Sequence, residues 1–216
     1  MVYPIGRLVI PAIMKIWLKK VEGTDNIPKN KAFIVCPNHS SFYDDLLIPS
    51  IIVPRVNRVL HMYVNRKFFR PFLLRRFLYW GGSIPVEVYD HPKKKDVNKN
   101  AFKKAVYYLK KGDSVGVYPE GHRTLDGELQ RAKVGAARLA LTAKVPVLPV
   151  GIIGSRDVLP KGQSLPRIRK IVRVIIGKPL YFDKYYGKQG DRKVLNNVTR
   201  KIMREIGKLI GKRYKY

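Results

Sequence analysis

Short apolar runs alternate with longer amphipathic stretches along this chain. The apolar runs, several rich in valine and isoleucine, predict strands, which we expect at 32–36, 59–64, 83–88, 114–118, 145–153 and 171–176. Stretches with apolar residues at helical spacing predict helices, which we expect at 41–50, 69–80, 97–111, 133–143 and 192–212. Strands alternating with helices indicate an α/β fold, a single domain with a mostly parallel central sheet flanked by helices.

Both ends of the chain predict amphipathic helices. At the first end, 3–20 mixes Leu8, Ile13 and Trp17 with basic residues, and Pro11 favours a kink there. At the other end, 192–212 carries an apolar stripe opposite a basic face. Either helix suits two roles, contact with a membrane interface or cover for the core of the domain.

The charge separates this chain from an ordinary globular domain of its size. The 216 residues include 44 Lys and Arg against 15 Asp and Glu, a net charge of +29. Such a field attracts polyanions, so the candidate partners are a nucleic acid or an anionic membrane surface. The basic residues follow no nucleic-acid-binding motif, which favours the membrane.

No run of about 18 apolar residues is present, so we expect no ordinary transmembrane helix. The apolar stretch near the start lacks a cleavage site and does not resemble a signal peptide. We therefore expect a peripheral or monotopic protein on the cytoplasmic face of the cell membrane. The lone cysteine, Cys36, excludes an internal disulfide and is expected to be a core residue.

A histidine and a carboxylate follow the first predicted strand. Residues 38–44 read N-H-S-S-F-Y-D, which places His39 and Asp44 five positions apart. Histidine is the usual proton acceptor near neutral pH, and a carboxylate can orient it. On one continuous helix the two side chains would point about 140° apart. The pair therefore requires His39 to precede the helix and Asp44 to lie in its first turn, with Asp45 as the alternative carboxylate.

A second block changes the meaning of the first. Residues 118–124 read Y-P-E-G-H-R-T, and 145–150 form an apolar run with two prolines. Together these blocks resemble the glycerolipid acyltransferase family, typified by lysophosphatidate acyltransferases, whose motifs read N-H-x-S-x-x-D and F-P-E-G-T-R-S. The resemblance covers roughly 31–154. With the amphipathic pattern near the start, we expect a membrane-contact segment, 1–25, followed by an acyltransferase domain, 26–216.

The resemblance implies roles for the residues of both blocks. His39 is the general base, Asp44 orients it, and Glu120, Gly121 and Arg123 bind the glycerol phosphate of the acceptor. The residue types suit these roles, because an arginine offers two parallel donors to a phosphate and a glycine permits close approach. No cofactor or metal is expected, since the sequence contains no cluster of metal ligands.

A further family motif supplies a lysine after one strand and an arginine near the end of the next. Arg66 aligns best with the lysine, and Lys67 is its neighbouring alternative. Val88 stands where the family usually has the arginine. This departure leaves the identity of the acceptor open.

The implied function is transfer of a fatty acyl group from a thioester to lysophosphatidate, giving phosphatidate. The donor would be acyl-CoA or acyl carrier protein, and the partner surface an anionic membrane. Other lysophospholipids or alcohols remain alternative acceptors. A basic nucleic-acid-binding protein is the alternative of another class, but it leaves the paired blocks unexplained.

Overall fold

The computed structural model describes residues 6–159, 163 and 165–216. The strands are β1 (Leu18–Glu22), β2 (Ile34–Pro37), β3 (Leu60–Asn65), β4 (Ile84–Val86), β5 (Ser114–Gly116), β6 (Val147–Ile153) and β7 (Val172–Ile176). The α-helices are α1 (Gly6–Met14), α2 (Asp44–Val56), α3 (Phe72–Trp80), α4 (Lys94–Lys110), α5 (Gly135–Ala143), α6 (Ser155–Val158) and α7 (Arg192–Ile210). Three short 3-10 helices are η1 (Thr24–Asn26), η2 (Arg66–Phe69) and η3 (Asp183–Tyr185).

The seven strands form one sheet in the order β1-β7-β6-β2-β5-β3-β4. Every neighbouring pair is parallel except β6 and β7, which run antiparallel. The prediction of an α/β domain around a mostly parallel sheet is therefore confirmed. Five adjacent strands, from β6 to β4, end at the same edge of the sheet, where the loops that follow them can meet.

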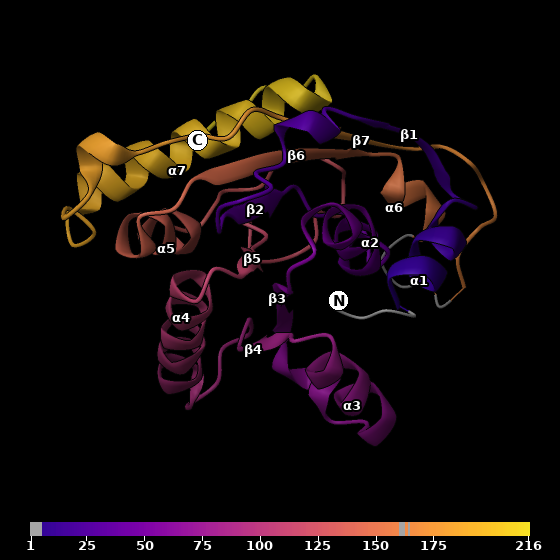
Figure 1. The fold of residues 1–216 in the computed structure, drawn as a ribbon, viewed down its shortest axis with the longest axis horizontal. Coiled ribbons are helices and arrows are strands. Elements are labelled where there is room, and N and C mark those ends of the chain that lie inside the picture. Colours follow the sequence, from indigo (N-terminus) through magenta and orange to yellow (C-terminus); the bar gives the residue numbers. More distant parts are fainter. Residues whose placement is uncertain (1–5, 160–162, 164) are drawn as a thin grey trace.

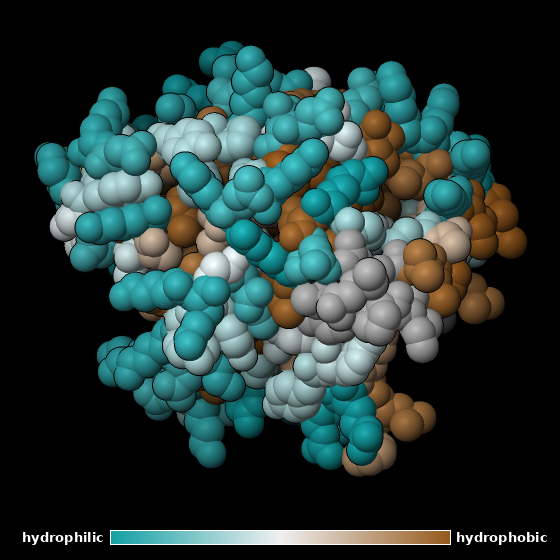
Figure 2. All heavy atoms as spheres, viewed as in Figure 1, coloured by the Kyte–Doolittle hydropathy of each residue, from teal (hydrophilic) through white to brown (hydrophobic). Residues whose placement is uncertain are grey.

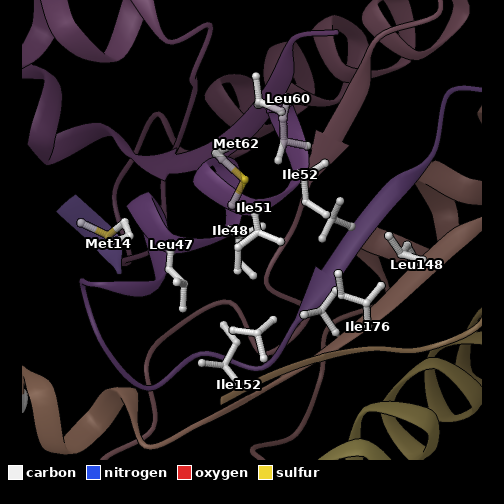
Figure 3. Packing of buried hydrophobic residues seen from close by; sticks show 14 of the residues in the cluster. Met14, Leu47, Ile48, Ile51, Ile52, Leu60, Met62, Leu148, Ile152 and Ile176 are labelled. Carbon is white, nitrogen blue, oxygen red and sulfur yellow. The ribbon is translucent and has the colours of Figure 1, made fainter. Parts of the chain in front are cut away.

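Two apolar layers cover the two faces of this sheet. On one face, α1 and α2 pack over the strands, and Figure 3 shows the side chains of α2 directed toward those of β3 and β6. On the other face, α4, α5 and α7 form the second layer. Figure 1 shows these two groups of helices on opposite sides, with α3 beyond α2 on the first.

Cys36 is fully buried as expected, and burial raises the pKa of its thiol.

The first predicted amphipathic helix is shorter than the sequence indicated. The helix ends at Met14, and residues 18–22 form strand β1, which pairs with β7. Lys19 and Lys20 therefore lie in a strand at the edge of the sheet and not on a helix. Alternation over this short strand is weak, because none of its five residues is fully buried. The part of the predicted helix before residue 6 lies outside the described residues.

The helix predicted at 69–80 is also divided. η2 ends at Phe69, Pro71 lies between the two elements, and α3 begins at Phe72. Proline lacks the backbone donor that a continuing helix requires, so the chain starts a new helix after it. None of the residues of α3 is buried.

The last helix, α7, packs on the core. Asp191 caps it by accepting hydrogen bonds from the backbone N–H groups of Lys193 and Val194. Its apolar residues, including Leu195, Val198 and Ile202, are buried, which leaves the basic face in solvent. Of the two roles open to this helix, cover for the core is the one its apolar stripe performs. Within the described residues, no helix is both long and apolar enough to cross a membrane.

Candidate active site

His39 lies in the loop between β2 and α2, at the edge where the parallel strands end. Its Nδ1 is 3.1 Å from Oδ2 of Asp44, which is the first residue of α2. The same carboxylate oxygen accepts hydrogen bonds from the backbone N–H groups of Ser40 and Ser41, each at 2.9 Å. His39 thus precedes the helix and Asp44 opens it, as the spacing required. The carboxylate fixed in this way orients the histidine.

The contact with Asp44 also defines the chemistry of the ring. A carboxylate only accepts hydrogen bonds, so the proton of the neutral imidazole lies on Nδ1. Nε2 then carries a lone pair, and His39 lines a large cavity. A neutral imidazole held in this tautomer can accept a proton from a hydroxyl group in that cavity.

The second block holds the backbone of His39 in place. Oε1 of Glu120 accepts a hydrogen bond from the backbone N–H of His39 at 3.0 Å, and the backbone N–H of Thr124 donates to the carbonyl of His39 at 2.9 Å. Oε2 of Glu120 accepts from the backbone N–H of Gln130 at 2.7 Å. Both oxygens of this buried carboxylate are therefore occupied by protein. Burial raises the pKa of Glu120 to about 7, although these two backbone donors favour its charged form.

Asn38 joins the first block to the apolar run with two prolines. Its side chain donates to the carbonyl of Ile152 at 2.9 Å and accepts from the N–H of the same residue at 2.7 Å. Ile152 belongs to β6, the strand formed by the run with two prolines. The side chain of Asn38 thus ties the loop that carries His39 to a second strand.

Tyr118 and Asp45 complete the surroundings of His39. The ring of Tyr118 stacks on the imidazole, with centroids 3.8 Å apart and planes 18° from parallel. Burial raises the pKa of the Asp45 carboxyl to about 6, although the nearby His39 and the hydroxyl of Tyr118 both act to lower it. The Tyr118 hydroxyl lies beside Asp45 but completes no well-formed hydrogen bond. Asp45, the alternative partner in the sequence, thus interacts with Tyr118, whereas Asp44 holds His39.

The large cavity has a volume of about 660 Å³ and a basic lining. Arg123 lies over the ring of Phe42, 3.4 Å from its centroid, and its buried Nη1 has no hydrogen-bond partner in the described part of the chain. Burial lowers the pKa of Arg123, while Asp45 opposes that effect. Gly121 also lines the cavity, with a φ of 75° that favours glycine.

Of the two candidates after β3, Lys67 lines the cavity and Arg66 does not. Both residues are exposed, so only the lining of the cavity distinguishes these two neighbouring cations. Val88 lines the cavity where the family usually has an arginine. Lys133, which the sequence analysis overlooked, lies against Gly121 and lines the same cavity. Its position just before α5 gave no motif by which it could be found.

A second cavity, of about 250 Å³, adjoins the first and is almost wholly apolar. Residues of α1, α2 and α3 line it, among them Ile10, Val53 and Leu78. Four residues line both cavities, and we call them the junction: Phe42, Asp45, Val64 and Phe68. The arrangement can therefore accommodate a hydrocarbon chain beside a polar, basic compartment that contains His39. Among the described residues, no three His, Cys, Asp or Glu side chains gather as a metal site.

Comparison with known proteins shows the family of this chain. The acyltransferase family model matches residues 19–153, so the chain belongs to the acyltransferase family. A chloroplastic 1-acyl-sn-glycerol-3-phosphate acyltransferase of Brassica napus is 29% identical over 76% of this chain and 45% of its own length. A protein of the same name from Bacillus subtilis is 26% identical over 75% of this chain and 73% of its own.

A solved structure shares the fold. The crystal structure of the 1-acyl-sn-glycerophosphate acyltransferase from Thermotoga maritima superposes with a TM-score of 0.71 at 23% identity. The match covers 96% of this chain and 80% of that one. The match covers 45% and 44% of the lengths of two curated relatives, so this chain spans less than half of each.

The raised pKa of Asp45 predicts a dependence of stability on pH. The folded protein holds this proton more tightly than the unfolded chain, so Asp45 makes the free energy of unfolding fall as pH rises from about 4 to about 6. In Asp45→Asn this part of the slope should disappear, and the variant should gain stability relative to wild type across that range. Urea unfolding at a series of pH values measures it, with the exposed Asp96→Asn as control. Parallel curves for wild type and Asp45→Asn would contradict the assignment.

Proposed function

We propose that this chain transfers a fatty acyl group from an acyl thioester to the free hydroxyl of 1-acyl-sn-glycerol 3-phosphate, giving phosphatidate. The observation that carries the proposal is the His39–Asp44 pair, placed in a basic cavity that adjoins an apolar one. A lysophosphatidate presents an anionic phosphate and a hydroxyl, and a fatty thioester presents a long hydrocarbon chain. The two compartments suit these two substrates.

The reaction follows from the tautomer of His39. Nε2 takes the proton of the acceptor hydroxyl as the oxygen attacks the thioester carbonyl, and Asp44 stabilises the imidazolium that forms. The tetrahedral intermediate then expels the thiolate, which receives the proton from Nε2. The C–S bond is replaced by a C–O bond, and His39 returns to its neutral state. No acyl-enzyme is needed, and neither Ser40 nor Ser41 acts as a nucleophile.

The acceptor phosphate is assigned to Arg123 and Lys67. Arg123 lines the cavity beside Phe42 and keeps a buried donor without a partner, as a site built for an anion would. Lys67 reaches the same cavity from η2. These two cations supply positive charge even though Val88 replaces the family's arginine. This favours lysophosphatidate over an uncharged alcohol as the acceptor.

The acyl chain of the donor is assigned to the apolar cavity. Its lining includes helices on the same side of the sheet as α2, and the four junction residues line it together with the cavity of His39. Burial of each methylene group in such a cavity contributes about 0.8 kcal/mol. A chain held there would present its thioester at the junction, next to the base.

An anionic membrane surface is the proposed location of the reaction. Figure 2 shows hydrophobic side chains gathered over α1 and α3. Leu8 on α1 and Leu73 on α3 are 75% and 79% exposed, and Arg75 and Arg76 are exposed on α3 as well. Apolar side chains flanked by cations suit the boundary of an anionic bilayer, to which each Lys or Arg adds about 1 kcal/mol. Both helices also line the apolar cavity, so lipid would have a direct path to it.

Removal of the base tests the reaction. His39→Ala should lower kcat for transfer from palmitoyl-CoA to lysophosphatidate by about 100- to 10,000-fold, because proton removal would fall to water. His91→Ala, an exposed histidine outside the cavity, serves as the control. Product formation in mixed micelles is followed by mass spectrometry. Equal rates in wild type and His39→Ala, or wild-type protein that acylates no lysophosphatidate, would overturn the proposal.

Filling the apolar cavity should change the preference for chain length. Leu78→Trp places a larger ring in the lining, so transfer of palmitoyl groups should fall more than transfer of octanoyl groups, by about tenfold in the ratio of kcat/KM. Leu73→Trp, on the same helix but exposed and outside the lining, is the matched control. A ratio that does not move in Leu78→Trp would place the acyl chain elsewhere.

Loss of an exposed ring on α3 should weaken membrane binding. Phe72→Ser should reduce co-sedimentation with vesicles that contain phosphatidylglycerol, since it removes an apolar contact of the kind that inserts at the interface. Tyr181→Ser removes an aromatic ring of similar exposure, 52% against 58%, from another part of the surface. Equal binding of the two variants would exclude α3 as the contact surface.

A further inference from the structure

The basic lining of the large cavity continues well beyond the assigned phosphate site. Lys95 and Lys99 reach it from α4, Lys133 precedes α5, and Arg138 lies on α5. We call these four residues the α4–α5 basic cluster. The proposed reaction uses none of them at His39, and the acceptor phosphate is assigned to Arg123 and Lys67.

The positive charge of the cluster is not balanced by neighbouring carboxylates. None of its four side chains forms an ion pair or hydrogen bond within the described part of the chain. The only carboxylates that line the cavity, among the described residues, are Asp45 and Glu87. Burial lowers the pKa of Lys133, and the nearby Lys94 lowers it further. All four residues are exposed, and cations that share one cavity lining without a carboxylate partner attract an anion to it.

The position of the cluster relative to the apolar cavity indicates which anion it binds. The apolar cavity lies under α1, α2 and α3 on one side of the sheet, whereas α4 and α5 cover the other (Figure 1). His39 lies between them, at the edge where the parallel strands end. A donor whose acyl chain fills the apolar cavity presents its thioester at His39, so the rest of the donor leaves toward α4 and α5.

Uncharged residues share the lining with His39 and the cluster, and they suit an uncharged linker. They include Val86, Phe102 and Val134, which offer apolar and van der Waals contacts but no charge. The pantetheine arm of a biological acyl thioester is an uncharged chain of amides that ends in a phosphate ester. Both coenzyme A and acyl carrier protein carry this same arm.

We propose that the α4–α5 basic cluster binds the phosphate ester at the end of the pantetheine arm of the acyl donor. This inference rests on the proposed function for the thioester, and it separates two anion sites in one cavity. Arg123 and Lys67 take the phosphate of the acceptor, and the cluster takes that of the donor. The donor then crosses the edge of the sheet, with its acyl chain on one side and its phosphate on the other.

Paired substitutions on α4 test this division. Lys95→Gln with Lys99→Gln should raise KM for palmitoyl-CoA about tenfold or more, because two cations would no longer face the phosphate. KM for lysophosphatidate should stay unchanged. Lys103→Gln with Lys104→Gln removes the same charge from the same helix outside the cavity lining and should leave both KM values unchanged. With a palmitoyl thioester of N-acetylcysteamine, which lacks the phosphate, wild type and both double variants should not differ.

Direct binding decides the question without turnover. Wild type is titrated calorimetrically with coenzyme A, phosphopantetheine and pantetheine, and it should bind the first two far more tightly than pantetheine. In the Lys95→Gln, Lys99→Gln variant, the affinity for coenzyme A and for phosphopantetheine should fall about tenfold. Equal affinity of coenzyme A and phosphopantetheine would assign the cluster to the phosphate that acyl carrier protein shares. Tighter coenzyme A would assign it also to the nucleotide phosphates.

Several results would overturn the inference while the proposed function stands. They are an unchanged KM for the donor, an equal rise in both double variants, or a rise confined to lysophosphatidate. Binding of pantetheine as tight as that of phosphopantetheine would do the same. A wild-type protein that transfers no acyl group would instead remove the proposed function, and the titrations would still report whether the cluster binds the phosphate.

Discussion

The site depends on the hydrogen bonds that hold the backbone of His39. Its N–H donates to Glu120 and its carbonyl accepts from Thr124, so the loop after β2 and the loop after β5 fix one another at neighbouring strand ends. The side chain of His39 is then oriented by Asp44, whose own carboxylate is held by two backbone N–H groups. Two motifs about eighty residues apart in the sequence thus act as one unit. A parallel sheet makes this possible, because its strands end at a common edge.

Polar groups without partners gather around this unit. Four buried side-chain atoms among the described residues have no hydrogen-bond partner, and three belong to Asp44, Tyr118 and Arg123. Such groups cost free energy in a folded protein and are uncommon outside functional sites. Their concentration here is consistent with a compartment that leaves hydrogen-bonding capacity for a substrate, next to an apolar cavity that needs none. The junction brings the two kinds of surface together at the base.

The sequence predicted the sheet and the His39–Asp44 pair because both depend on local patterns, alternating apolar runs and one short spacing. It did not predict β1, since a strand at the edge of a sheet has too little buried surface to impose an apolar pattern. It favoured Arg66 over Lys67, because only the three-dimensional turn of η2 decides which neighbour faces the cavity. The contact of Glu120 with the backbone of His39 left no trace in side-chain spacing, because backbone groups are the same at every position.

The most direct test is the kinetic effect of Glu120→Gln. One oxygen of Glu120 becomes an amide in this variant, and a backbone N–H at His39 or Gln130 loses its acceptor. If Glu120 holds the loop of His39, kcat should fall at least tenfold while KM for lysophosphatidate stays unchanged, in a protein that still unfolds cooperatively. A raised KM for lysophosphatidate with an unchanged kcat would contradict this account and would make Glu120 a ligand of the acceptor.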